Sequence, residues 1–96
     1  MSHTVYVEFK CQEGKGPEFL DVLLPALSDT RVFDGCESKE TFVNMEDGDT
    51  VVLWENWRDR SAQEAYLTWR VETGMLDLIG PFMAGAPAFV HLDPKD

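Results

Sequence analysis

Basic residues are scarce in this chain, and no stretch of it is basic. Eight lysines and arginines stand against eighteen aspartates and glutamates, which gives a formal net charge of -10 at pH 7. Nucleic-acid phosphates and anionic lipid surfaces are bound by clustered lysine and arginine. We therefore expect neither a nucleic-acid partner nor a membrane partner.

Cysteine and long apolar runs are also rare. The two cysteines, Cys11 and Cys36, form no CxxC pair, and we interpret them as small packing residues because free cysteine is usually buried and inert. The N-terminus has no secretory hydrophobic segment, and no apolar run approaches the length that crosses a bilayer. These absences favour a cytoplasmic protein with reduced thiols.

Histidine is equally sparse, with His3 and His91 as the only two. They could be neighbours across a sheet, and two histidines with a carboxylate can hold a metal. Neither belongs to an HxH or HxxxH pair, so we expect no metal site.

The composition is otherwise that of a globular protein, with 44% hydrophobic and 27% charged residues among 96. We expect residues 1–96 to form one domain. A chain this short buries a small share of its surface, and oligomerisation commonly compensates for this.

Hydrophobic periodicity predicts the secondary structure. Alternating residues such as Val5, Val7 and Phe9 are typical of a strand, and Leu20, Leu23 and Leu27 form one stripe of a helix. The strands are predicted over residues 3–11, 36–45, 50–58 and 86–92, and the helices over 17–29, from 61 onward, and over 75–79.

Local signals predict the ends of these elements. Pro25 should kink or loosen the first helix. The segment 46–49 is predicted to be a hairpin turn, with Asp47-Gly48 supplying positive φ. Ser61 and Glu64 are predicted to form a capping box that begins the second long helix.

The order β-α-β-β-α-β predicts an α+β fold of the ferredoxin-like type, a four-stranded antiparallel sheet with helices on one face. The segment 50–58 is apolar on both faces over its first half. Helices can cover one face only, so we expect a second copy of the chain to cover the other.

With these elements in place, the chain resembles the antibiotic biosynthesis monooxygenase (ABM) family of dimeric α/β barrels. The residues that carry the resemblance are Glu13-Gly14 with Phe19, Gly35-Cys36, and Glu55-Asn56-Trp57-Arg58-Asp59 followed by Ser61-Ala62-Gln63-Glu64-Ala65. The resemblance implies a homodimer packed sheet against sheet, with a pocket between sheet and helices in each protomer. It also implies a planar phenol or quinol as ligand, oxygenated by O₂ without metal, flavin or haem.

Two departures from the family pattern are visible. The histidine that many members carry early in the second helix falls at Tyr66. In a haem-degrading branch an asparagine, a tryptophan and a histidine fall at Val7, Trp69 and Ile79, and only the tryptophan is present here. We therefore expect no haem degradation.

Oxygenation of a phenol requires a group that accepts the hydroxyl proton, and the candidates are His91, Tyr66 and Glu55. A carboxylate in an apolar strand could act as a base near neutral pH. Glu55 could instead make a structural hydrogen bond or salt bridge, and His91 could be a histidine on the strand surface.

Aromatic residues could line a pocket for a planar ligand, with Asn56 orienting a substrate oxygen. The proposed substrate-binding residues are Trp69, Trp57, Asn56, Phe9 and Phe82. Each aromatic residue could instead belong to a plain hydrophobic core, and Asn56 could be an ordinary polar residue at a sheet edge.

The function favoured by this sequence is a cofactor-independent monooxygenase that acts on a small planar phenol or quinol. One alternative is a dimer that binds a small molecule without catalysis. A second alternative is a structural dimer whose interior is filled by its own side chains.

Overall fold

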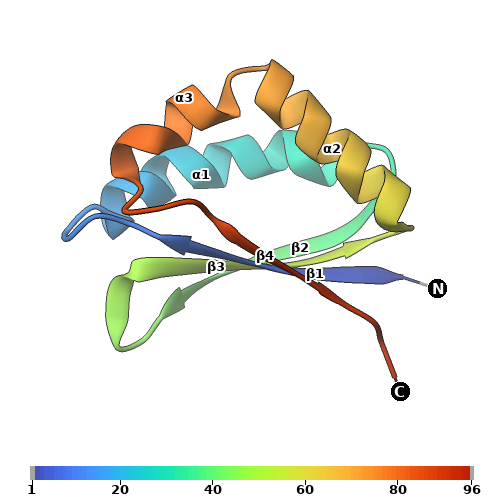
Figure 1. Ribbon diagram of the computed structural model, residues 1–96, viewed down its shortest axis with the longest axis horizontal. Helices are drawn as coiled ribbons and strands as arrows, with labels where there is room; N and C mark the ends of the chain where they lie inside the picture. The colour runs from blue at the N-terminus through green and yellow to red at the C-terminus, as the bar shows by residue number, and fades with distance from the viewer. Residues whose placement is uncertain (1, 96) are drawn as a thin grey trace.

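A computed structural model describes residues 2–95, and four strands in it form one antiparallel sheet with the order β2-β3-β1-β4 (Figure 1). The elements are β1 (His3–Lys10), α1 (Gly16–Arg31), β2 (Cys36–Asn44), β3 (Asp47–Trp57), α2 (Arg60–Glu72), α3 (Met75–Ile79), η1 (Gly80–Phe82) and β4 (Ala88–Leu92). This is the predicted ferredoxin-like α+β fold, so the prediction of the fold class is confirmed.

The alternation of side chains divides the sheet into two faces. β1 lies between β3 and β4, and its register places Val5 opposite Glu55 and Val7 opposite Leu53. Since directly paired residues point to the same side of a sheet, these side chains share the face that the helices cover. All the helices lie on this one side in Figure 1.

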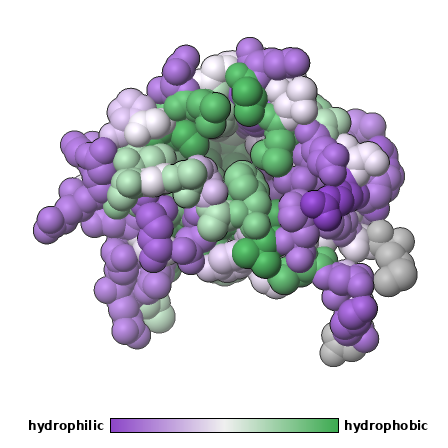
Figure 2. Space-filling view, in the orientation of Figure 1, coloured by the Kyte–Doolittle hydropathy of each residue, from purple (hydrophilic) through white to green (hydrophobic). Residues whose placement is uncertain are grey.

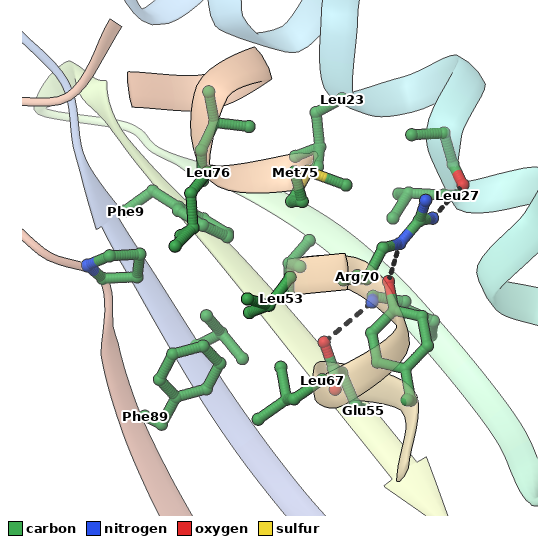
Figure 3. A pocket seen from close by; sticks show the side chains of 17 residues that line it. Phe9, Leu23, Leu27, Leu53, Glu55, Leu67, Arg70, Met75, Leu76 and Phe89 are labelled. Carbon is green, nitrogen blue, oxygen red and sulfur yellow. Dashed lines mark hydrogen bonds and ion pairs between the residues drawn. The ribbon is translucent and has the colours of Figure 1, made fainter. Parts of the chain in front are cut away.

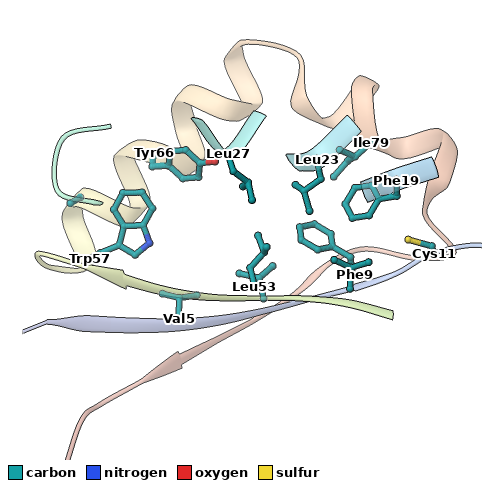
Figure 4. Close-up of a cluster of buried hydrophobic side chains, with 13 residues drawn as sticks. Val5, Phe9, Cys11, Phe19, Leu23, Leu27, Leu53, Trp57, Tyr66 and Ile79 are labelled. Atoms are coloured by element: carbon teal, nitrogen blue, oxygen red, sulfur yellow. The ribbon is translucent and has the colours of Figure 1, made fainter. Parts of the chain in front are cut away.

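The core forms between this sheet face and the helices, as Figure 4 shows. α1 contributes Phe19, Leu23 and Leu27, which are almost fully buried. Pro25 does not end α1, which continues to Arg31. Pro25 is exposed, so water can hydrate the carbonyl group that its missing N–H leaves unpaired.

The other face of the sheet carries exposed apolar side chains. Phe42, Trp54 and Val90 each expose more than a third of their surface. Phe42 lies in β2, Trp54 in β3 and Val90 in β4. In the sheet they pair with Val52, Glu40 and Tyr6, respectively. Among residues 2–95 no helix covers this face.

The predicted hairpin turn is misplaced. The chain turns at Met45-Glu46, and Asp47-Gly48 already belongs to β3. Asn44 fixes the turn because its side-chain oxygen accepts a hydrogen bond from the Glu46 N–H at 2.8 Å, the local bonding that favours asparagine in turns.

The predicted capping box is also wrong. Asp59, not Ser61, caps α2: its extended backbone precedes the helix, and its carboxylate accepts a hydrogen bond from the Ala62 N–H at 2.8 Å. Glu64 instead pairs with Arg60 at 3.2 Å.

Over residues 2–95, each helix is too short or too polar to span a bilayer. Burial raises the pKa of both the Cys11 and the Cys36 thiol. Both thiols therefore stay protonated at neutral pH, as expected of packing residues.

Candidate functional site

A cavity of about 220 Å³ lies between the sheet and the helices. Figure 2 shows hydrophobic side chains gathered around a hollow in this region. Every layer contributes apolar side chains to its wall: Val7, Phe9, Leu53 and Phe89 from the sheet, Leu23 and Leu27 from α1, Leu67 and Val71 from α2, and Met75, Leu76 and Ile79 from α3.

The cavity opens where α3 and the end of α2 approach β4. Three of its lining residues, Val71, Leu76 and Phe89, are 55%, 59% and 41% exposed, whereas the remaining walls are mostly buried. Figure 3 shows Phe9, Leu76 and Phe89 on one side of the cavity and Glu55 and Arg70 on the other. The entrance is therefore apolar, and the charged groups lie away from it.

The first part of the charged end is an ion pair between neighbouring strands. β2 and β3 pair Lys39 with Glu55, and their Nζ and Oε2 atoms are 2.9 Å apart. Their side chains are only 2% and 4% exposed. The second carboxylate oxygen of Glu55 accepts a hydrogen bond from Trp57 Nε1 at 2.9 Å, so both oxygens have partners.

The second part is a hydrogen-bond network around Tyr66. Arg70 follows Tyr66 by four residues on α2 and donates from Nε to the tyrosine hydroxyl at 2.8 Å. Arg70 Nη2 donates to the Ala26 carbonyl at 2.6 Å and to the Thr30 hydroxyl at 2.8 Å. The hydroxyl groups of Thr30 and Tyr66 are 2.6 Å apart. This network ties α2 to α1 at the closed end of the cavity.

Two cations lie close to the Tyr66 ring. Lys39 Nζ lies 4.8 Å from the ring centroid, and the Arg70 guanidinium carbon lies 5.3 Å from it. Cations over an aromatic face are attracted by the ring quadrupole, more strongly when they are desolvated. The ring thus helps to hold both positive charges at the cavity.

His91 lies outside the cavity lining. It pairs with Val5 in the sheet, and its Nδ1 is 2.8 Å from Nε2 of His3. The pKa of His91 is lowered mainly by burial, then by the positive charge of Arg60 and by His3, while Glu64 acts in the opposite direction. The 2.8 Å distance makes the two histidines neighbours across the sheet. No group of three or more metal-binding side chains forms anywhere in residues 2–95.

Three of the eight predicted site residues line the cavity: Phe9, Glu55 and Tyr66. His91, Trp69, Trp57, Asn56 and Phe82 do not.

These other residues have partners elsewhere. Trp57 is fully buried and donates a hydrogen bond to Glu55, while the Trp69 ring packs on Phe33. Asn56 lies on the outer face of the sheet, where it accepts a hydrogen bond from Thr4 and donates one to Ser38. Phe82 packs on Phe19 in the core, with ring centroids 6.2 Å apart.

Sequence reasoning missed two residues of the site, Lys39 and Arg70. A signal for Arg70 existed, because the i,i+4 spacing places it on the same helix face as Tyr66. Lys39 could be found only by fixing the register of the β2–β3 hairpin, and the misplaced turn prevented this.

The fold and the cavity define the class of the protein: a ferredoxin-like α+β domain with an apolar, ligand-sized chamber between sheet and helices. The family model for antibiotic biosynthesis monooxygenase matches residues 2–70. The chain therefore belongs to the antibiotic biosynthesis monooxygenase family, which confirms the resemblance in its sequence.

Solved structures support the same fold. The crystal structure of an antibiotic biosynthesis monooxygenase matches with a TM-score of 0.85 at 20% identity, covering 98% of this chain and 99% of that one. A putative antibiotic biosynthesis monooxygenase from Caulobacter crescentus gives 0.83 at 23% identity, covering 99% and 91%. A conserved protein from Methanosarcina mazei gives 0.86 at 14% identity, covering 99% and 94%. A comparison with curated proteins finds no match.

Proposed function

We propose that this protein is a homodimeric, cofactor-independent monooxygenase that oxidises a small planar phenol or quinol with O₂. The observation that carries the proposal is the cavity itself, which has apolar walls, an apolar entrance and a cluster of polar side chains at its closed end. Pockets of this kind, mostly apolar with a few convergent polar groups, are typical of ligand sites.

The size of the cavity favours a ligand of one or two rings. A dry apolar cavity of about 150 Å³ can hold benzene, and this cavity has about 220 Å³. Its wall includes the Phe9 and Phe89 rings together with aliphatic side chains, which suits a flat apolar body. A planar ligand would place its oxygen beside Tyr66 and its ring toward the entrance.

The proposed reaction draws all its electrons from the substrate. The phenol loses its hydroxyl proton, a carbon of the electron-rich ring forms a bond to O₂, and the O–O bond then breaks. One oxygen atom remains on the ring as a quinone carbonyl and the other leaves as water, so phenol and O₂ give quinone and water. The cavity would shield the reactive ring from solvent while this occurs.

Tyr66 is the best-placed of the three candidates for moving the proton, because it lines the cavity and its hydroxyl is linked to the hydroxyl of Thr30. Glu55 shares the wall, but both of its oxygens are engaged by Lys39 and Trp57, which favours a structural role. His91 does not line the cavity, so it could accept the proton only from a substrate that reaches it outside the cavity.

The outer face of the sheet supports the proposed homodimer. Phe42, Trp54 and Val90 are exposed there, and sheet-against-sheet contact would bury them. Burial contributes about 25 cal/mol per Å² of apolar surface, so a patch spread over several strands stabilises the association.

A dimer that binds a ligand without catalysis remains the alternative, because the same cavity serves both functions. The second alternative, an interior filled by its own side chains, is disfavoured by the void beside Tyr66.

Oxygen uptake tests the proposal. We expect 1,4-dihydroxynaphthalene or a related hydroquinone to consume O₂ faster with the protein than in a blank, with the activity lost in Tyr66→Phe. His91→Ala would lose activity as well if His91 takes part in the reaction. Stabilisation by the quinol without any catalysed O₂ uptake would select the non-catalytic alternative.

A further inference from the structure

The charged end of the cavity has an excess of positive charge. Its lining contains two cations, Lys39 and Arg70, and one anion, Glu55, which leaves a net charge of +1. Lys39 is 6% exposed and Arg70 is 9% exposed, so solvent screens these charges poorly. The chain as a whole carries -10, which makes a buried positive site unusual for this protein.

Hydrogen-bond donors at this end outnumber acceptors. Lys39 Nζ has three N–H groups, and Glu55 is its only ion-pair partner among residues 2–95. Arg70 uses Nε and Nη2, while its Nη1 makes no hydrogen bond with the described residues. Lys39 Nζ and Arg70 Nη1 therefore keep N–H groups that can donate to an acceptor in the cavity.

Among residues 2–95 the buried side-chain oxygen atoms without a hydrogen-bond partner are Thr41 Oγ1 and Gln63 Oε1, and neither residue lines the cavity. Both oxygens of Glu55 are occupied, and the Tyr66 hydroxyl is already bonded to Arg70 and Thr30. The missing partner is therefore an acceptor-rich, negatively charged group on the ligand. Such a group would neutralise the net +1 and occupy the unused N–H groups.

We infer that the cavity binds a planar monoanion, with an ionised carboxylate, enolate or phenolate held by Lys39 Nζ and Arg70 Nη1 and an apolar ring toward α3 and β4. This inference deepens the proposed function and rests on it only in using the same cavity. It identifies the substrate class as acidic aromatic molecules that are anions when bound.

A matched pair of probes tests the inference on the wild-type chain. 2-Naphthoate and 2-naphthamide have nearly the same shape and differ in charge, and titration calorimetry at pH 7.5 gives both dissociation constants. A charge-assisted hydrogen bond contributes about 1.5–3 kcal/mol and each 1.4 kcal/mol is a factor of ten, so we expect naphthoate to bind about 10–100-fold more tightly. Equal affinities, or no binding of either probe at millimolar concentration, would overturn the inference.

Two cavity variants shift the preference in opposite directions. Arg70→Met removes one positive charge and should lower the preference for naphthoate about tenfold, whereas Glu55→Gln removes the anion and should raise it. Arg60→Met is the matched control, because it makes the same change of net charge at a side chain that is 62% exposed and outside the cavity lining. If Arg70→Met does not fold, Arg70→Lys should retain the preference for naphthoate over naphthamide. Glu55→Gln then still tests whether removing a negative charge raises that preference.

Oxygen uptake separates this inference from the proposed function. Naphthoate preference without catalysed oxidation of any phenol supports the monoanion site and overturns the monooxygenase. Oxidation of neutral quinols by a protein that binds naphthoate and naphthamide equally overturns the monoanion site and leaves the monooxygenase standing. Equal effects of Arg60→Met and Arg70→Met on the preference would also overturn the site.

Discussion

The buried ion pair between Lys39 and Glu55 gives the most demanding prediction about this protein. Lys39→Met leaves the Glu55 carboxylate buried with the Trp57 N–H as its only remaining partner among residues 2–95. Removing one partner of a buried pair costs about 3–5 kcal/mol because the other charge stays uncompensated. Since a domain is stable by only about 5–15 kcal/mol, this is a large share of the total.

Urea unfolding followed by tryptophan fluorescence measures this cost. With a slope of about 1–3 kcal/mol per M, the midpoint of Lys39→Met should fall by more than about 1 M. The exposed pair of Lys15 and Glu18, 3.2 Å apart with side chains 44% and 59% exposed, provides the control. We expect Lys15→Met to change stability by less than about 1 kcal/mol.

The double variant Lys39→Met/Glu55→Gln tests the cause. Glutamine removes the charge but retains an oxygen that can accept from Trp57 Nε1, so the double variant should be more stable than Lys39→Met alone. All variants are compared at one protein concentration, because unfolding of a dimer depends on concentration. A cost below about 1 kcal/mol for Lys39→Met, or a double variant less stable than the single one, would refute the reasoning.

Three further predictions follow from other parts of the structure. The pKa of His91 is lowered below its usual 6.5, so its NMR titration midpoint should lie below 6.5, and a midpoint above 6.5 contradicts this. The contribution of His91 to the free energy of unfolding is full above pH 6.5 and should fall as the pH drops through the folded pKa. Asp59→Ala should cost about 1 kcal/mol in thermal unfolding because it removes the cap of α2, whereas Ser61→Ala should be nearly neutral. Trp54→Glu should dissociate the proposed dimer in sedimentation experiments, while Val32→Glu, at a site that is 82% exposed, should not; a stable wild-type monomer at micromolar concentration would exclude the proposed dimer.

The sequence by itself determined the elements and their order. Alternation in the strands and the leucine stripe of α1 depend on neighbours within one element, and each element needs one apolar face to pack. The same local logic predicted Phe9, Glu55 and Tyr66 as site residues that line the cavity, because each lies on the apolar face of its strand or helix.

Only the tertiary structure decided how the site is assembled. Whether Lys39 meets Glu55 depends on the register of β2 and β3, and a turn shifted along the chain changes every cross-strand pair. Whether Arg70 reaches the Ala26 carbonyl depends on how α2 packs against α1. His91 lies outside the cavity for the same reason: where a strand lies relative to a cavity is fixed by contacts between elements distant in sequence, which local periodicity does not encode. Asn56 is different, because it follows Glu55 in the same strand and alternation already places it on the other face of the sheet.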